Sequence, residues 1–257
     1  MAGNVSARIA SARELRTRLA DLPAPGSFSE AELEGLPDPV RRYFEAAVVQ
    51  GTPLATSAHL RMVGSIKLGE RWAPFRARQI EAPHHGFAWS ARAGLIVGSD
   101  RYADGHGAMN WRVLGLVRVM HADGPDISRS AAGRVGAEAV WVPTALLPRF
   151  GVTSATDPHH VTASYRLDEV DIELHYTLGD DARVRSVVFD RWGDPDNTGT
   201  WGKHSFGFEV TGHSTFEGVT IPSSGRAGWF YGTDRWVEGE FFRSEITDCH
   251  LVTGTSQ

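Results

Sequence analysis

The feature that most constrains the fold is a long succession of strand-length runs that begins near residue 57 and continues almost to the end of the chain. Apolar and polar residues alternate within the runs, and clusters of Gly, Pro, Asp or His separate them, which is typical of strands joined by short turns. We interpret these segments as strands: SAHLRMVGSIKL (57–68), FRARQIEA (75–82), GFAWSARA (86–93), LIVGSDRYAD (95–104), MNWRVLGLVRVM (109–120), HHVTASYRL (159–167), DIELHYTL (171–178), RVRSVVFDRW (183–192), HSFGFEVTG (204–212), FEGVTIPS (216–223), GRAGWFYG (225–232) and VEGEFFRSEIT (237–247). About ten strands exceed the comfortable size of a flat sheet, so we expect the sheet to curl or to split into two layers.

The organisation of the chain indicates a single domain. No repeat, low-complexity tract or linker divides the strand-like region, and 257 residues fit one large β-rich domain. We predict a mainly β fold of the α+β class over residues 1–257, with a helical N-terminal pack (1–50) followed by a large antiparallel sheet (57–252). The sheet is expected to form a curled layer or half-barrel whose concave face is filled by one inserted helix (127–142).

Three helices are expected in the N-terminal pack. The segment 4–22 has a thin apolar stripe that indicates a surface helix, made of Val5, Ile9, Leu15 and Leu19. A second, short helix is expected from the N-cap Ser29, because Glu32 stands three residues further on as in a capping box. A third helix is expected to begin at Asp38, with a proline at its first position, and to end at Gly51.

The inserted helix is predicted from RSAAGRVGAEAVWVPTALLP (129–148), which has helical periodicity. One apolar stripe consists of Ala132, Val135, Ala139, Val142 and Leu146. The third face carries only the small residues Ser130, Gly133, Gly136 and Ala137, where a solvent-facing helix usually carries Lys and Glu. Interior glycines cost about 1 kcal/mol each relative to Ala. We therefore expect other backbone to approach this face closely and to bury the helix. Pro143 is expected to end it.

Arg134 and Glu138 lie one turn apart on a second stripe of this helix, with Trp141 next along it, so they would enter the interior together. A buried charge is tolerated only when it is paired. Two interpretations follow. Either the pair only neutralises itself, or Glu138 faces a cavity as an acid–base or binding group, with Arg134 orienting it and Trp141 forming a wall.

Aromatic residues and strand-end carboxylates supply the other candidates. In RAGWFYGTDRW (226–236), Trp229 and Tyr231 share a strand face, a combination suited to gripping an apolar ligand and one oxygen. Asp190 is interpreted as the last residue of its strand and as a further acid–base candidate. We predict a catalytic set of Glu138, Tyr231, Arg134 and Asp190. We predict a substrate-binding set of Trp141, Trp229, Trp192, Trp111 and Tyr102.

Several motifs resemble an uncharacterised bacterial family of domains of unknown function. In chain order they are LPDPVRRYFEAAV (36–48), RMVGSIKLGERWAPFRARQ (61–79), AEAVWVPTALLP (137–148), RVRSVVFDRW (183–192), TWGKHSFGF (200–208) and GEFFRSEI (239–246). The resemblance covers most of residues 36–246. It implies an antiparallel β fold with a hydrophobic interior, similar to lipid-carrier half-barrels, and no established reaction. Many relatives look membrane-anchored at the N-terminus, whereas this N-terminal segment has no long apolar run, so we expect no membrane anchor.

Other functional classes lose their usual support. A net charge of −5 argues against nucleic acid as a partner. The motifs GxGxxG, GxxxxGK[ST], GxSxG and HExxH are absent, so we expect no organic cofactor. The pairs His84–His85 and His159–His160 are adjacent in sequence and give no chelating set, so we expect no metal. The lone Cys249 cannot form an intramolecular disulfide, and without a signal segment we expect a cytoplasmic protein.

Two functions remain. The first is a cofactor-independent enzyme that performs cyclase, isomerase or hydratase chemistry on a hydrophobic small molecule in the curled sheet, since an apolar site raises the pKa of a carboxyl group toward neutral pH. The second is a carrier of a lipid-like molecule that performs no chemistry. Converging polar groups in the cavity would favour the enzyme, and a purely apolar tunnel would favour the carrier. The oligomeric state stays open.

Overall fold

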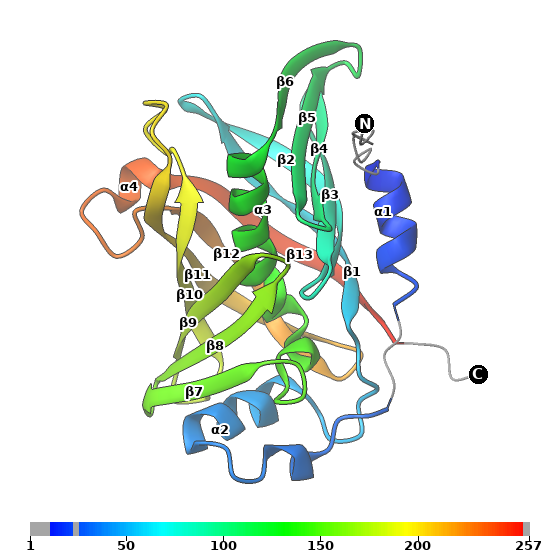
Figure 1. Cartoon of the computed structure of the whole chain (residues 1–257), viewed down its shortest axis with the longest axis vertical. Helices are drawn as coiled ribbons and strands as arrows, with labels where there is room; N and C mark the ends of the chain where they lie inside the picture. Colours follow the sequence, from blue (N-terminus) through cyan, green and yellow to red (C-terminus); the bar gives the residue numbers. More distant parts are fainter. Residues whose placement is uncertain (1–10, 23–25, 254–257) are drawn as a thin grey trace, which may run out of the picture.

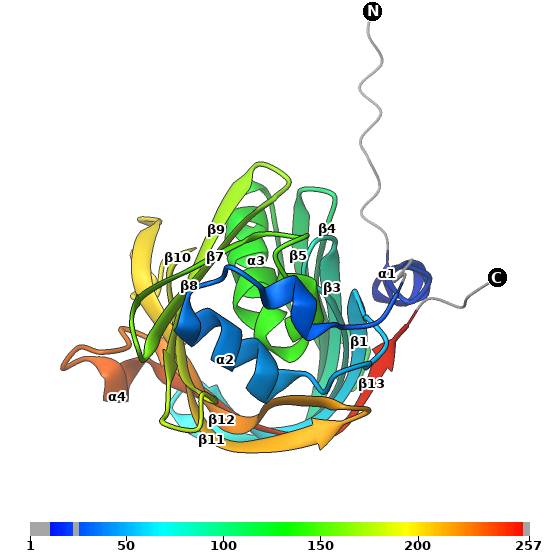
Figure 2. The ribbon, with the colours of Figure 1, turned by 90° about the horizontal axis from the view of Figure 1, so that it is seen from below.

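The computed structural model describes residues 11–22 and 26–253. In that part of the chain, thirteen strands form one antiparallel sheet in the order β6-β5-β4-β3-β2-β1-β13-β12-β11-β10-β9-β8-β7. The strands are β1 (Ser57–Leu68), β2 (Arg71–Ala82), β3 (Gly86–Ala93), β4 (Ile96–Ala103), β5 (His106–Val113), β6 (Val117–Asp123), β7 (Val152–Asp157), β8 (His160–Leu167), β9 (Val170–Leu178), β10 (Val184–Gly193), β11 (Gly202–Phe216), β12 (Val219–Trp229) and β13 (Glu240–Val252). The sheet curls around a central helix, as Figures 1 and 2 show, so the predicted half-barrel with an inserted helix is confirmed.

Tight turns divide the sheet more finely than the sequence alternation predicts. The single strand predicted over 109–120 is wrong, because Leu114 and Gly115 adopt φ angles of 52° and 72° and make the turn between β5 and β6. The two strands predicted over 216–223 and 225–232 are wrong. Phe216 ends β11, a turn follows, and the single strand β12 runs from Val219 to Trp229. The polar sequence of β7 gives no strand signal, although the strand forms the second edge of the sheet.

The inserted helix α3 (Pro125–Glu138) lies inside the curl, with β4 and β5 on one side and β9 and β10 on the other. Its predicted apolar stripe is buried. The α-helix ends four residues before the predicted end at 142, and the chain continues as two 3-10 turns, η2 (Ala139–Trp141) and η3 (Pro143–Leu146). Pro143 disfavours a helical conformation at the residue before it, and Val142 accordingly has φ −131° and ψ 63°.

Close neighbours explain the small residues of α3. A Cβ atom on Gly136 would lie 2.5 Å from Cγ2 of Ile172, so the group that approaches here is a side chain and not backbone as expected. Gly107 of β5 allows the opposite contact, since its Cβ would lie 2.8 Å from Cβ of Ala131 and 2.9 Å from Cα of Ser128. Gly133 and Ala137 are half-buried. The small residues of α3 on one side and Gly107 of β5 on the other therefore let the helix pack against both halves of the sheet.

We predict that Gly107→Ala lowers the free energy of unfolding by about 1–3 kcal/mol, because the added methyl group forces α3 away from β5. Urea denaturation of the purified variant measures the loss. Gly202→Ala is the matched control, since a Cβ there would meet only Nε2 of His204 at 3.6 Å. Equal stability of the two variants would contradict the packing described here.

The N-terminal helices pack on the outer face and at the lower end of the curl. The helix α1 (Ala12–Leu19) packs Leu15 and Leu19 against the outer face of β2, β3 and β4, while the predicted stripe positions Val5 and Ile9 fall outside the described residues. The turn η1 (Glu30–Leu33) has the predicted capping box. The helix α2 (Asp38–Ala47) covers the lower end of the curl, as Figure 2 shows, and ends before Gly51 because Val48 is already extended.

The rest of the helical structure is slight. The short helix α4 (Trp236–Gly239) lies between β12 and β13. None of the helices in the described part of the chain is long and apolar enough to cross a bilayer.

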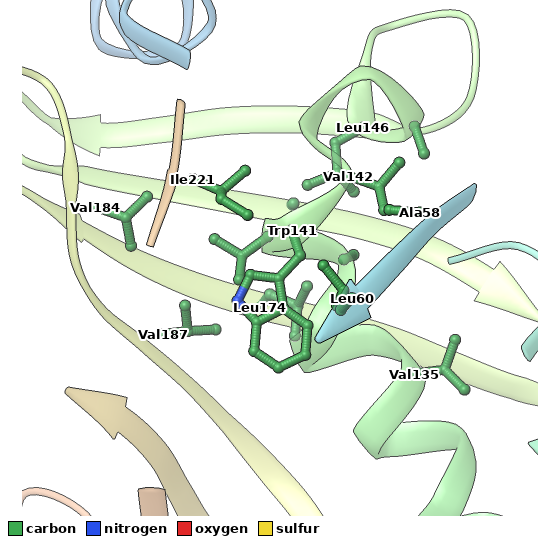
Figure 3. Packing of buried hydrophobic residues seen from close by; sticks show 14 of the residues in the cluster. Ala58, Leu60, Val135, Trp141, Val142, Leu146, Leu174, Val184, Val187 and Ile221 are labelled. Carbon is green, nitrogen blue, oxygen red and sulfur yellow. The ribbon is translucent and has the colours of Figure 1, made fainter. Parts of the chain in front are cut away.

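The core fills the lower half of the curl, between α3, η2 and the strands. Figure 3 shows Trp141 surrounded by aliphatic side chains from β1, β9, β10 and β12, among them Leu60, Leu174, Val187 and Ile221. The indole Nε1 of Trp141 donates a hydrogen bond to the carbonyl oxygen of Pro222 at 3.1 Å. This packed layer separates the covered lower end from the upper half of the curl.

Candidate functional site

A cavity of about 710 Å³ lies between α3 and the concave face of the sheet. Ten of its lining residues are aromatic, among them Trp89, Phe189, Phe206, Phe208, Trp229 and Phe242. It reaches the β1–β2 turn at Gly69 and the β10–β11 loop at Pro195, which belong to the upper end of the curl. At the other end it is bounded by Trp141 and the core beneath it. The cavity therefore opens at the upper end of the half-barrel and ends in the protein interior.

A polar cluster lies beside this cavity and is called the Arg134 cluster below. Its members Arg134, Glu138 and Asp100 line the cavity, and Gln79 and Glu81 lie behind them. Nε of Arg134 donates to Oε1 of Glu138 at 2.8 Å, and its NH1 lies 3.1 Å from Oδ2 of Asp100. Nε2 of Gln79 donates to Oε2 of Glu138 at 2.5 Å and to Oε2 of Glu81 at 2.9 Å. The α3 pair is thus tied to β4 and β2 and does not stand alone.

Burial sets the protonation of the cluster. It raises the pKa of Glu81 well above the ordinary value, and the charge of neighbouring Glu138 adds to the effect. Burial also raises the pKa of Asp100, although the charge of Arg134 and the indole N–H of Trp111 oppose the shift. The charges of Glu138 and Asp100 outweigh the burial of Arg134 and raise its pKa. Arg134 therefore stays cationic, and Glu81 resists ionisation.

The raised pKa of Glu81 predicts a pH-dependent effect of Glu81→Gln. A carboxyl whose pKa is higher in the folded than in the unfolded protein destabilises the fold increasingly as the pH rises above its unfolded value of about 4.3. We expect equal unfolding free energies near that pH and a growing advantage of Glu81→Gln toward pH 8, measured by urea denaturation across the range. Glu30→Gln, the same substitution at an exposed position, is the control. If the unfolding free energy of the wild type instead rose relative to that of Glu81→Gln with increasing pH, the raised pKa of Glu81 would be contradicted.

The structure brings five of the predicted site residues to one cavity. Arg134, Glu138, Trp141, Trp229 and Trp111 all line it. The indole of Trp111 donates to Oδ1 of Asp100 at 2.9 Å and so belongs to the polar wall. Trp229 stands on the aromatic wall with its ring edge-on to Phe206.

Two of the predicted catalytic residues lie outside the cavity. The placement of Tyr231 beside Trp229 is wrong, because β12 ends at Trp229 and Phe230 has a φ of 60°, which breaks the strand alternation. The ring of Tyr231 packs instead on Trp236 and over Gly207. Asp190 is exposed on the face of β10 opposite Phe189, and it is not the last residue of its strand, which runs to Gly193.

Two predicted wall residues have structural contacts elsewhere. Nε1 of Trp192 donates to Oδ1 of Asp126 at 2.8 Å, and the guanidinium of Arg129 lies 4.0 Å from the ring centroid, so Trp192 holds the start of α3. The hydroxyl of Tyr102 donates to Oδ2 of Asp168 at 2.7 Å and so ties β4 to the β8–β9 turn. Neither residue lines the cavity.

Four polar residues at the site belong to none of the predicted sets, although their positions in the strand alternation could have indicated them. Gln79 and Glu81 continue the inward alternation of Phe75 and Ala77 on β2, and both are buried. Arg191 is in phase with the inward Phe189, where the neighbouring Asp190 is not. Asp100 is a buried acid on the concave face of β4. An ionisable residue that alternates in phase with the apolar residues of its strand is therefore a sequence signal for a polar group on the concave face.

Metal ligation has no assembled donor set. In residues 11–22 and 26–253, no three His, Cys, Asp or Glu side chains gather as a metal would require. Nε2 of His84 lies 2.7 Å from the carbonyl oxygen of Ala145, and Nδ1 of His160 lies 2.8 Å from Asp157. The Arg134 cluster has three carboxyl groups, but its guanidinium already occupies the position between two of them.

Comparisons with solved structures returned several low-identity matches. A putative outer membrane lipoprotein-sorting protein domain from Vibrio parahaemolyticus is 8% identical, with 78% of this chain and 87% of that chain covered and a TM-score of 0.42. A LolA superfamily protein from Nitrosomonas europaea is 6% identical over 82% and 93% of the two chains, with a TM-score of 0.43. A DUF1329 family protein from Desulfovibrio piger is 11% identical over 85% and 92%, with a TM-score of 0.36.

The family comparison covers most of the half-barrel. No curated protein matches the chain. The profile of a family of unknown function, DUF6544, matches residues 26–241, which include η1, α2, the strands from β1 to β12 and the inserted helix. The match also spans the motifs around α3 that carry the resemblance noted in the sequence. The chain belongs to the family of unknown function DUF6544.

Proposed function

We propose that this protein binds a hydrophobic small molecule in the cavity between α3 and the sheet and carries it without transforming it. The observation that supports this most is the cavity itself, at about 710 Å³ with aromatic walls and one open end. Ligand sites for small molecules are concave, mostly apolar, and have a few placed polar groups. Both properties are combined here in a fold whose remaining interior is closely packed.

The hydrogen bonding of the cavity carboxylates favours a carrier over an enzyme. Both oxygens of Glu138 accept hydrogen bonds, from Arg134 and from Gln79, and both oxygens of Asp100 are engaged, by Trp111 and Arg134. A general base has to reach a proton on the substrate. These groups are instead directed at each other, as expected for charges that stabilise a buried wall.

A cofactor-independent enzyme is the second candidate, because one observation favours it. The carboxyl of Glu81 has a raised pKa and is linked through Nε2 of Gln79 to Glu138, which lines the cavity. A buried carboxyl group with a raised pKa is a suitable proton source for acid–base catalysis such as isomerisation or hydration. In that case Glu138 is the acid–base group and Arg134 orients it.

The binding proposal is tested with N-phenyl-1-naphthylamine, a neutral apolar probe that fluoresces in apolar surroundings. We expect saturable binding at about one probe per chain, with energy transfer from the tryptophans of the cavity wall. Native mass spectrometry of the untreated protein is expected to show a co-purified apolar ligand that the probe displaces. Absence of saturable binding to the folded, ligand-free protein would overturn the proposal.

Glu138→Gln separates the two candidates. The amide keeps a contact with Arg134 but removes the negative charge of Glu138. Its N–H group also replaces one of the two acceptor oxygens. We therefore expect about 1.5–3 kcal/mol less stability and unchanged probe affinity. Urea denaturation and probe titration on this one variant give both values. A stable variant whose affinity falls by about tenfold or more would favour the enzyme and contradict the structural role.

A further inference from the structure

The side chain of Arg191 lacks the partner that a buried guanidinium normally has. It reaches the cavity from β10, with its guanidinium carbon 4.7 Å from the ring centroid of Phe206 and 5.1 Å from that of Trp229. Its Nε is buried without a hydrogen-bond partner, and among the described residues it forms no ion pair. Arg134, by contrast, contacts two carboxylates.

The surroundings of Arg191 do not neutralise it. Burial and the like charge of Arg134 lower the pKa of Arg191 to about 10, and the charge of Arg134 acts on it more strongly than those of Glu138 or Asp100. Arg191 is therefore still cationic at neutral pH. A half-buried cation whose Nε is buried without a partner is unfavourable, so the hydrogen-bonding capacity of this side chain is available to the contents of the cavity.

We propose that the cavity ligand is an anionic amphiphile whose carboxylate or phosphate is held by Arg191 while its apolar part lies against the aromatic wall. This rests on the proposed binding function. A guanidinium presents its donors as a planar fork that matches both oxyanions in a bidentate contact. The rings of Phe206 and Trp229 pack against the guanidinium group and restrict its orientation, so less conformational entropy is lost when the anion binds.

The test uses displacement of N-phenyl-1-naphthylamine by ligands of one chain length: decanoate, monodecyl phosphate and decanol. We expect at least one of the two anions to bind about tenfold or more tightly than decanol, and the two anion arms show whether carboxylate or phosphate is preferred. Arg191→Met should lose this preference and keep its affinity for decanol. Arg191→Lys should keep part of it, and Arg185→Met on the outer face should keep all of it.

Two outcomes would overturn the anion site. The wild type could bind decanol as tightly as both anions, or Arg191→Met could retain the preference. The proposed function fails separately, through absence of binding by the neutral probe, because that probe makes no demand on Arg191.

A different observation concerns the open end of the half-barrel. Eight of the ten exposed large hydrophobic side chains in the described residues lie at this end. Most belong to three turns that are called the rim hairpins here: β1–β2, β3–β4 and β5–β6. Leu95, Leu114 and Leu116 at their tips are 61%, 63% and 77% exposed. The β5–β6 hairpin stands above the rest of the molecule at the top of Figure 1, and its Val119 and Met120 also line the cavity.

The charge of the rim hairpins is opposite to that of the whole protein. The chain has a net charge of −5. The rim hairpins carry one acidic residue, Glu70, against five basic residues near the turns: Lys67, Arg71, Arg92, Arg112 and Arg118. Trp72 is half-buried among them, with the guanidinium of Arg243 at 4.4 Å from its ring centroid. Apolar tips surrounded by basic residues and a tryptophan are typical of surfaces that enter a lipid interface.

We infer that the rim hairpins dock on an anionic lipid surface, with the leucine tips inserted among the acyl chains and the basic residues against the headgroups. The cavity mouth then faces the membrane, because the same hairpins border it. This orientation lets an apolar ligand pass between bilayer and cavity without crossing water.

Flotation of the full chain with lipid vesicles tests this inference. We expect it to float with phosphatidylglycerol vesicles and to float less with phosphatidylcholine vesicles or at high salt. The double variant Leu114→Ser/Leu116→Ser should stay unbound. The matched control Val49→Ser/Val152→Ser, which removes two exposed valines outside the rim hairpins, should float like the wild type.

Three results would overturn the membrane surface. The first two are absence of flotation of the wild type and unchanged flotation of the leucine variant. The third is a dimer, detected by light scattering, that the leucine substitutions dissociate, because it would assign the rim hairpins to contact with a second copy of this chain. Probe binding in solution is expected to be the same in all variants, so this inference and the proposed function fail independently.

Discussion

Replacing Arg134 by methionine is expected to lower the free energy of unfolding at pH 7 by about 3–5 kcal/mol, the usual cost of removing one partner from a buried charge cluster. Arg134 forms ion pairs with both Asp100 and Glu138, whose side chains are 13% and 14% exposed. Methionine has a similar length and packs against Phe87 and Trp89, where the guanidinium now lies. The expected loss is therefore electrostatic, and chemical denaturation measures it.

The pH dependence of this loss identifies its origin. Without Arg134, the pKa of Asp100 rises further, since the charge of Arg134 now opposes the effect of burial. A folded-state pKa above the unfolded one makes the penalty shrink as the pH falls, so Arg134→Met should regain stability between about pH 7 and pH 4. The control Arg185→Met removes an exposed contact with Asp181 and should cost at most about 1 kcal/mol. A loss that does not change with pH would point to packing instead.

The second large effect is expected from Ala137→Trp, which fills the cavity from α3. Ala137 is half-buried and lines the cavity, so an indole at this position occupies space that the ligand needs. We expect probe binding to fall by about a hundredfold or more while the protein stays folded. Ser130→Trp, nearer the start of the helix, is expected to have a weaker effect in the same direction.

The control for cavity filling is Val152→Trp, which adds the same ring to an exposed position on the edge strand β7. It should leave probe affinity unchanged, and near-ultraviolet circular dichroism should show native packing in all three variants. Full probe affinity in a folded Ala137→Trp protein would contradict the assignment of the cavity as the binding site.

The architecture could be predicted because strand alternation and one helical segment recur over a long stretch. The small face of α3 predicted close packing, and Gly136 against Ile172 confirms the contact, although side chains supply it where backbone was expected. Boundaries were less predictable. The turn at Leu114 has no glycine at its first positive-φ position, so alternation appeared to continue through it.

The candidate site could be predicted only where one element carries it. Arg134 and Glu138 share a helix face, so their pairing follows from spacing alone. Their partners Asp100 and Gln79 come from strands 34 and 59 residues away, and no local pattern relates such positions. Tyr231 shows the reverse case: an ideal strand would place it beside Trp229, but the positive φ of Phe230 ends the strand first.

Binding of a hydrophobic molecule between α3 and the concave face of the sheet can be mapped by photo-crosslinking. A neutral aliphatic diazirine is equilibrated with the ligand-free protein, irradiated, and mapped by peptide mass spectrometry. We expect cross-links on cavity residues such as Met109, Trp229 and Phe242, and their loss in Ala137→Trp. Cross-links confined to the outer face of the sheet, or unchanged in Ala137→Trp, would contradict it.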